Sequence, residues 1–281
     1  MLETRQFNPS DLMRTIIATV RTDPGCVREA NEDSGRHVQP NDADTRLQKG
    51  TLTIVADGMG GHASGEVASQ MAVELISEIY YSENGLSAPD ALRNAIEIAN
   101  EQIYEASESG EEFSGMGTTV IALVLQNDTA FCAHVGDSRL YRFRNGNLEM
   151  LTIDHSQVME MVAQGIITME QARNHDDKNV ILRAVGTQPF VEVEVSDEFE
   201  VVVGDTFLLC SDGLSDMLED TVIEAILRSE PDLHTASEKL ISAAKDNGGH
   251  DNITAGIVRI EARNNTETSQ NVRITREVEM A

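Results

Sequence analysis

The chain has 281 residues, 40% of them hydrophobic, and is therefore long enough to bury a sizeable core in one large domain. Its 21 Lys and Arg residues face 48 Asp and Glu residues, and the resulting net charge of −27 argues against nucleic acid or an anionic membrane as a partner. No run approaches the ~18 apolar residues that cross a bilayer, and no basic region followed by an apolar stretch opens the chain, so we expect a cytoplasmic protein.

Strand-like segments are spread along most of the chain. Residues 1–14 are polar, and we expect them to form an N-terminal lead-in outside the folded domain. Residues 263–281 lose apolar periodicity, which predicts a disordered C-terminal tail. This leaves one domain over residues 15–262. The predicted strands are, in chain order, Thr15–Val20, Thr51–Ala56, Thr118–Leu125, Ala130–Val135, Arg139–Phe143, Leu148–Thr152, Thr206–Cys210 and Ile253–Ile260. Asn145-Gly146-Asn147 predicts a hairpin turn.

Apolar residues at helical spacing predict four helices that come in two adjacent pairs. The first pair is Glu66–Tyr81 and Pro89–Ser107, with Ser87 as an N-cap. The second pair is Asp220–Arg228 and Leu233–Asp246. A doubly wound parallel fold would place one helix after each strand. The paired order instead favours antiparallel sheets with helix pairs packed outside them.

Aspartates stand at the end or start of four apolar strands. They are Asp57, Asp137, Asp212 and Asp251. Two carboxylates ~4 Å apart repel by ~4 kcal/mol at an effective dielectric near 20, so convergence of these strand ends requires proton sharing or bound cations. Oxygen ligands without a His or Cys cluster suit Mg²⁺ or Mn²⁺. The three cysteines are far apart and predict neither a disulfide framework nor a zinc site.

A pair of hard cations held by carboxylates suits phosphoester hydrolysis. Such cations polarise phosphoryl oxygens and lower the pKa of a bound water, so no covalent protein nucleophile is needed. The chain also lacks the Gly-x-Ser-x-Gly elbow of hydrolases that use a serine nucleophile. It lacks a Walker loop as well, which argues against nucleotide-driven chemistry.

Seven segments together resemble a known family. In chain order they are Arg28–Ser34 (REANEDS), Val55–His62 (VADGMGGH), Gly115–Thr119 (GMGTT), His134–Arg139 (HVGDSR), Asp154–Ser156 (DHS), Ser211–Asp216 (SDGLSD) and Asp251-Asn252. The set resembles the metal-dependent Ser/Thr protein phosphatases, also called type 2C phosphatases, in their compact bacterial form. The resemblance spans about residues 15–260 and depends on the order of all seven segments.

The resemblance implies a ligand role for several residues. Asp57 is expected to bridge two core Mn²⁺ or Mg²⁺ ions, with the Gly58 carbonyl as a ligand of the second ion. Asp212 and Asp251 are expected to complete the shell of the first. Asp137, together with Asp212, is expected to hold a weaker third ion.

The resemblance also assigns residues around these ions. Glu32 and Asp33 are expected near the second ion, largely through bound waters. Arg28 stands where the family grips phosphate, and a guanidinium matches a phosphate dianion bidentately. Two roles stay open for His62: protonation of the leaving serine oxygen, or support of the Gly-rich turn.

The implied fold is α+β, a four-layer αββα sandwich in which two central antiparallel β-sheets are flanked by helix pairs. A flap beside the active site is expected at residues 156–186, where Thr168 and Gln171 predict a capping box.

The implied function is a monomeric protein serine/threonine phosphatase that acts on phosphorylated proteins, the targets of a cognate Ser/Thr kinase. An enzyme of the same fold dedicated to one regulatory phosphoprotein remains an alternative. A non-catalytic pseudophosphatase that only binds is disfavoured, because every expected ligand position and the phosphate arginine are filled.

Overall fold

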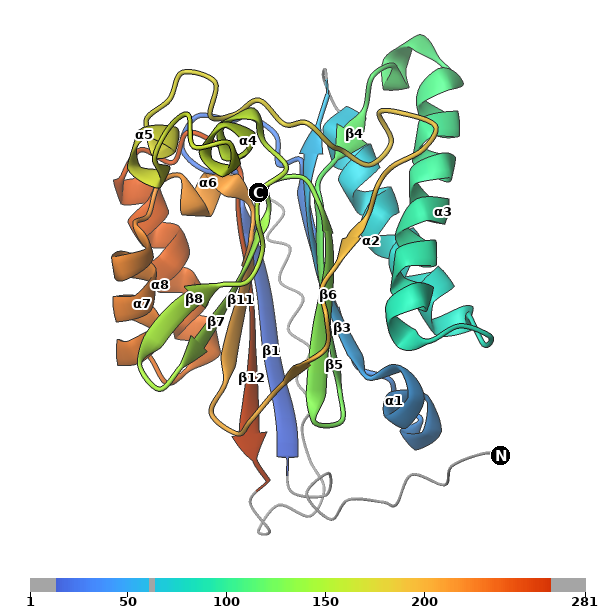
Figure 1. Ribbon diagram of the computed structural model, residues 1–281, viewed down its shortest axis with the longest axis vertical. Helices are drawn as coiled ribbons and strands as arrows, with labels where there is room; N and C mark the ends of the chain where they lie inside the picture. The colour runs from blue at the N-terminus through green and yellow to red at the C-terminus, as the bar shows by residue number, and fades with distance from the viewer. Residues whose placement is uncertain (1–13, 61–63, 264–281) are drawn as a thin grey trace.

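The computed structural model describes residues 14–60 and 64–263, which form two packed antiparallel sheets (Figure 1). The first sheet has the order β1 (Arg14–Asp23), β12 (Ile253–Ala262), β11 (Thr206–Cys210), β7 (Arg139–Arg144) and β8 (Asn147–Met150). The second has the order β10 (Phe199–Glu200), β6 (Thr129–Val135), β5 (Val120–Gln126), β3 (Thr51–Met59) and β2 (Asp33–Val38). Two short strands extend the second sheet: β4 (Gly117–Thr118) pairs with β3, and β9 (Glu194–Val195) pairs with β6.

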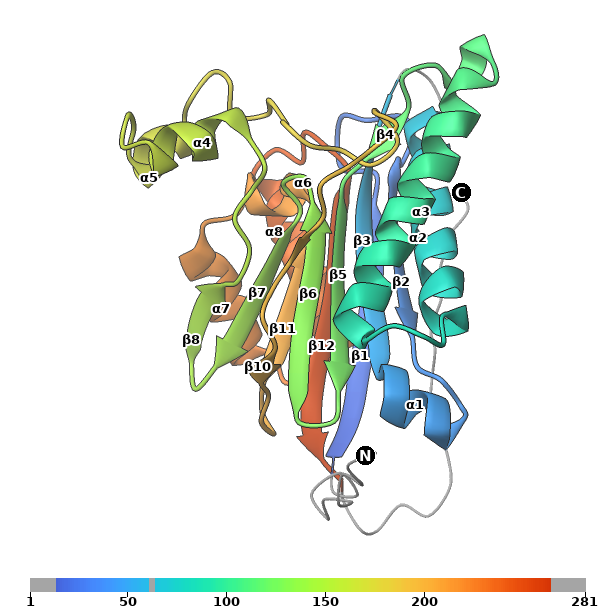
Figure 2. The same ribbon diagram turned by 45° about the vertical axis from the view of Figure 1, so that its right-hand side comes forward.

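Apolar side chains on both faces of the strands hold four layers together. Between the sheets, Val55 and Ile121 pack in one cluster with Phe207 and Val258, and all four are fully buried. Outside the second sheet lie α2 (Ser64–Ser82) and α3 (Ala88–Glu108) (Figure 2). Outside the first lie α7 (Asp220–Ser229) and α8 (Leu233–Asp246). The predicted four-layer αββα sandwich is therefore confirmed.

The cap and the hairpin turn that the sequence predicted are both present in the structure. The Ser87 side chain caps α3 by accepting a hydrogen bond from the Asp90 amide. The β7–β8 hairpin turns through Asn145 and Gly146, which have φ values of 52° and 84°, as a type I′ turn requires. The strand β1 begins at Arg14, one residue before the predicted start of the domain, because Arg14 pairs with Ala262 of β12.

The strand β3 continues past the point at which the sequence predicted its end. We expected Asp57 to follow the strand, but Gly58 and Met59 pair with Thr118 and Gly117 of β4, and this pairing carries β3 on to Met59. Asp57 therefore lies inside a paired strand, where its backbone is fixed on both sides.

Several short elements escaped prediction. They are β2, β9, β10, the helices α1 (Ala43–Lys49), α4 (Gln157–Ala163) and α6 (Asp212–Ser215), and a 3₁₀ turn at Glu111–Phe113. Of α5 (Met169–Arg173), only the start was predicted. The strand β2, DSGRHV, lies at the edge of its sheet, and five of its six residues are only partly buried, so few of them need to be apolar. Apolar alternation could not reveal such a strand.

The segment predicted as a flap holds α4 and α5, which stand apart from the sandwich at one end (Figure 2). A bridge between Ser156 and Ile181 closes its base. The predicted capping box is present, with Thr168 and Gln171 each accepting from the other's backbone amide. Among the described residues, no helix has the length and apolar content needed to cross a membrane.

Candidate metal centre

Four of the predicted carboxylates come together where the two sheets meet at one end of the sandwich. Asp33 and Asp57 are directly opposite each other on β2 and β3. Asp212 is the first residue of α6, just after β11, and Asp251 immediately precedes β12. The charges of Asp33, Asp212 and Asp251 all act on the carboxyl of Asp57, as does that of a fifth carboxylate, Asp137, which lies between β6 and β7. Both sheets therefore contribute carboxylates to the cluster.

Asp33 is bonded to the sheet opposite its own. Its Oδ2 accepts hydrogen bonds from the Ser211 hydroxyl at 2.8 Å and from the Thr254 hydroxyl at 2.7 Å. Ser211 precedes α6, and Thr254 lies on β12. These two bonds fix the distance between the sheets at the cluster, and they leave the other oxygen of Asp33 for another partner.

Several buried carboxylate oxygens have no hydrogen-bond donor in the described part of the chain. They are Oδ1 of Asp33, Oδ1 of Asp137 and Oδ1 of Asp212. Buried polar atoms are almost always paired, and an unpaired one needs an explanation. Oxygen-only groups of this kind are the donors that hard divalent cations prefer. The residues present therefore fit the expected ions.

The raised pKa values of the carboxyl groups also indicate a site for cations. Burial, and then the neighbouring carboxylates, raise the pKa of Asp33 to about 7, while burial and the charges of Asp216 and Asp251 raise that of Asp212 to about 6. The pKa values of Asp57 and Asp137 are raised well above the usual range for the same two reasons. The cluster therefore disfavours its own ionised form unless positive charge is supplied.

Glycines at two positions allow Glu32 to reach this cluster. The Gly58 amide donates to the Glu32 carbonyl at 3.1 Å. A Cβ at Gly58 would lie 2.4 Å from that carbonyl oxygen, and a Cβ at Gly65, in the first turn of α2, would lie 2.8 Å from the Glu32 carboxyl carbon. Any larger residue would displace Glu32. Gly58 and Gly65 are thus explained by the close approach of Glu32 to both positions.

Arg28 lies at the rim of the cluster. Its guanidinium is half-exposed and pairs with Asp251 through an Nη2–Oδ2 contact of 2.8 Å. The ion pair places a bidentate anion-binding group next to a predicted metal ligand. His62 lies outside the described residues.

Asn252 belongs to the last of the seven segments, but the sequence assigned it no role. It is buried, and its Nδ2 donates to the carbonyls of Pro24 and Ala30 at 3.1 and 2.9 Å. Its Oδ1 accepts from the Glu32 amide at 2.8 Å. One side chain thus holds the loop that carries both Arg28 and Glu32. Its position next to Asp251 was the only available signal.

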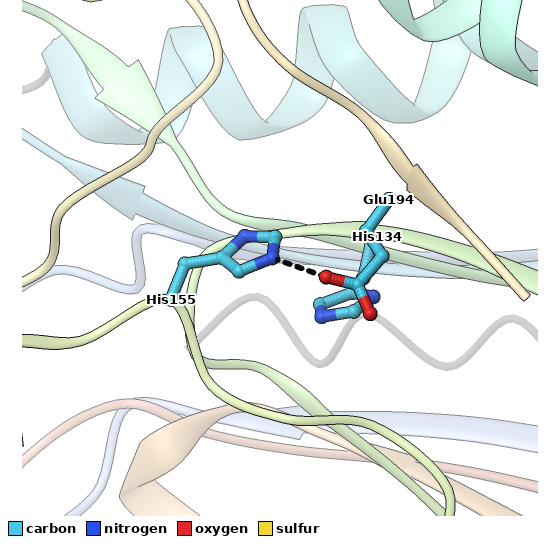
Figure 3. A group of neighbouring side chains, drawn as sticks. All are labelled: His134, His155 and Glu194. Carbon is cyan, nitrogen blue, oxygen red and sulfur yellow. Dashed lines mark hydrogen bonds and ion pairs between the residues drawn. The ribbon is translucent and has the colours of Figure 1, made fainter. Parts of the chain in front are cut away.

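A second group of possible ligands consists of His134, His155 and Glu194 (Figure 3). In the described chain it is the one set of three His, Cys, Asp or Glu side chains whose ligand atoms all lie within 4.8 Å of one another. No three aspartates of the cluster meet this condition.

The histidine group is already bonded internally. The Gly136 amide donates to Nδ1 of His155 at 3.2 Å, so the Nε2 of that ring carries the proton and donates to Glu194 at 3.1 Å. His134 stacks on His155 with ring centres 4.5 Å apart, and its own Nε2 donates to the Ile153 carbonyl. No lone pair of His155 faces Glu194. The group therefore braces β6, the flap base and β9, and offers no metal site in this arrangement.

Comparison with known proteins agrees with this geometry. The family described as Protein phosphatase 2C matches residues 30–255. The serine/threonine phosphatase stp of Listeria welshimeri is 42% identical over 247 residues, which cover 86% of this chain and 94% of that protein. The structure of the Mycobacterium tuberculosis serine/threonine phosphatase PstP/Ppp superposes with a TM-score of 0.78 at 35% identity, covering 88% of this chain and 99% of that one. A PstP catalytic domain solved with two manganese ions superposes with a TM-score of 0.74 at 33% identity, covering 88% and 99% of the two chains.

The three hydrogen bonds of Asn252 give a first prediction. Asn252→Asp keeps the shape but turns a carboxylate oxygen toward two backbone carbonyls, and we expect it to lower the free energy of unfolding by about 2–4 kcal/mol. Asn247→Asp is the matched control, because Asn247 is exposed and donates only one bond, to the Met217 carbonyl. Urea unfolding in chelator measures both variants. Equal losses would show that Asn252 does not hold the loop.

The raised carboxyl pKa values predict how pH changes the stability of the metal-free protein. Between about pH 4 and pH 7 the unfolded chain releases protons that folded Asp33 and Asp212 retain. The unfolding free energy therefore falls as the pH rises through this window. We expect the Tm in chelator to drop by at least about 5 °C from pH 5 to pH 8.

Removing one charge from the cluster should flatten this dependence. Asp57→Asn should show a smaller drop in Tm than the wild type, whereas Asp197→Asn, at an exposed position, should not. Thermal unfolding followed by circular dichroism compares the three proteins. A drop of the same size in Asp57→Asn would show that carboxylate repulsion does not set the pH dependence.

Proposed function

This chain belongs to the protein phosphatase 2C family and is a serine/threonine phosphatase, and we propose that it hydrolyses phosphoserine and phosphothreonine on proteins at the carboxylate cluster between its two sheets. The observation that carries the proposal is the set of buried, unpaired carboxylate oxygens on Asp33, Asp137 and Asp212. No hydrogen-bond network of the described chain uses them. Divalent cations would satisfy them and offset the burial and the repulsion that raise their pKa values.

The ligands we propose are those that the cluster brings together. Asp57, Asp212, Asp251 and the Gly58 carbonyl would hold two core Mn²⁺ or Mg²⁺ ions. When bound, such ions lower the pKa of a coordinated water and polarise the phosphoryl oxygens. Asp137 would share a weaker third ion with Asp212, whose charge acts directly on it.

Glu32 and Asp33 have positioning roles in this proposal. Asp33 receives two hydroxyl bonds on one oxygen, so its other oxygen has a fixed direction toward the cluster. Glu32 is held through its own backbone, by Gly58 on one side and Asn252 on the other. Both carboxylates can then orient water without side-chain rearrangement.

Arg28 would bind the phosphate group of the substrate. Its present partner, Asp251, is a proposed metal ligand, so cation binding there would compete for the carboxylate and release the guanidinium. A freed guanidinium at the rim can bind two phosphate oxygens at once. The guanidinium of Arg28 would then exchange the Asp251 carboxylate for a phosphate group of similar geometry.

Turnover separates a phosphatase from a non-catalytic binding module. A phosphatase dedicated to one regulatory phosphoprotein would carry the same cluster, so specificity assays alone distinguish it. A pseudophosphatase would lack a ligand or the arginine, and all expected positions are filled here. The cognate kinase, the monomeric state and the cytoplasmic location expected from the sequence stay predictions, as does the role of His62.

Asp57→Asn tests the cluster as the site of chemistry. The substitution keeps the size of the side chain but removes the anion proposed to bridge the ions, so we expect kcat to fall by at least about 10³-fold. Phosphate release from a phosphothreonine peptide, with and without Mn²⁺, is the measurement, and Asp197→Asn is the control. Wild-type turnover that persists in excess chelator, or robust Mn²⁺-dependent turnover by Asp57→Asn, would contradict the proposal.

Arg28→Ala tests the phosphate grip. Loss of a charge-assisted contact of about 1.5–3 kcal/mol should raise KM about tenfold to a hundredfold, with a smaller change in kcat. Arg21→Ala is the matched control, because Arg21 is also paired with a surface carboxylate, Glu238. A KM that is the same in Arg28→Ala and wild type would remove Arg28 from the site.

A further inference from the structure

We propose that the cavity under the flap binds a lysine or arginine side chain of the phosphoprotein substrate, close to the phosphorylated residue. The cavity has a volume of about 480 Å³ and lies between the flap helices α4 and α5 and the α6–α7 segment. This volume is within the usual range of ligand pockets. The inference rests on the proposed function and names a substrate feature that the catalytic cluster alone does not define.

The cavity is continuous with the proposed catalytic cluster. Asp137 and Asp212 line it, and both are proposed metal ligands. A peptide whose phosphate lies at the cluster therefore has neighbouring side chains within reach of the cavity. Ser215 also lines it, is buried, and has a hydroxyl without a hydrogen-bond partner in the described residues. That hydroxyl is available to a polar group entering the cavity.

Charge determines the kind of side chain that fits. Seven carboxylates and three basic side chains line the cavity. Each basic side chain is already paired with a lining carboxylate, in the pairs Arg139–Asp154, Arg173–Glu219 and Lys178–Asp216.

Four of the lining carboxylates have no basic partner. Two of them, Asp137 and Asp212, are proposed metal ligands. The other two are Glu170 and Asp220, both exposed. Glu170 has no ion pair within the described ranges, and Asp220 accepts only a 3.4 Å contact from the Tyr141 hydroxyl. The surplus charge of the cavity is therefore negative and lies at its outer part. An acidic substrate residue would be repelled there.

The walls between these charges are apolar and adaptable. Val158, Met150, Met159 and Met169 line the cavity, and methionine side chains adjust to irregular shapes. A lysine or arginine has a long apolar stem that can pack on such walls while its charged end stays near water. A short or purely apolar side chain would use the walls but leave the carboxylates without a partner.

The flap is fixed in the position that forms this cavity. Nη2 of Arg173 donates to the Ser215 and Leu218 carbonyls at 3.1 and 2.6 Å, and Lys178 contacts Asp216 at 2.5 Å. These contacts join the flap to the segment that directly follows Asp212. The cavity is thus formed before any substrate arrives, which lowers the cost of binding.

Phosphothreonine peptides that differ at a single position test the proposal. At each position within three residues of the phosphothreonine, lysine, norleucine and glutamate are compared by kcat/KM with Mn²⁺. We expect one or more positions at which lysine exceeds glutamate about fivefold to tenfold, with norleucine in between. Glu170→Lys should abolish or invert this ratio. Hydrolysis of a small aryl phosphate by the same variant should be unchanged, because that substrate does not reach the cavity.

A second variant separates the cavity from the general negative surface. Glu160 is exposed on α4 of the same flap but does not line the cavity, so Glu160→Lys changes the net charge equally. The proposal is overturned if both variants change the lysine preference by the same factor, or if the wild type shows no preference. Failure of the proposed function looks different: no peptide and no aryl phosphate is hydrolysed by the wild type.

Discussion

Repulsion among buried carboxylates is the constraint on which the rest of this structure depends. Asp33, Asp57, Asp137 and Asp212 all have raised pKa values, because burial removes water and their neighbours carry the same charge. A folded chain keeps such groups together only if other forces hold the elements that carry them. The deep apolar packing between the sheets, and of the helix pairs outside them, supplies those forces.

The two-sheet architecture turns this constraint into a site. Both sheets bring aspartates, so neither sheet alone holds the cluster. The hydroxyl bonds that Asp33 receives from Ser211 and Thr254 cross between the sheets at the same place. Asn252 then ties the arginine-bearing loop to the start of β12. Ligand positions are thus set by backbone that is paired or capped, which limits how far the carboxylates can retreat from one another.

Much of the fold and the site could be predicted before the structure. Long apolar strands and periodic helices such as α3 are strong local signals, and Asn145-Gly146 specified its turn directly. The strand β2 could not be predicted, since its six residues, DSGRHV, show no apolar alternation. The continuation of β3 past Asp57 could not be predicted either, because its partner β4 lies some 60 residues further along the chain. The role of Asn252 could not be predicted, because it consists of contacts with residues more than 200 positions away.

By itself, the sequence determined the order of the long apolar strands and of the four long helices, the oxygen-only chemistry of the site and the family to which the chain belongs. These properties depend on residue type and local spacing, which the chain carries whether or not it is folded. Only the tertiary structure decided which carboxylate oxygens lack a partner, that Arg28 rests on Asp251, and that the histidine group is internally bonded. It also decided that the flap leaves a cavity with surplus negative charge. Each of these depends on distances between segments far apart in the chain, and such distances are fixed only when the two sheets pack.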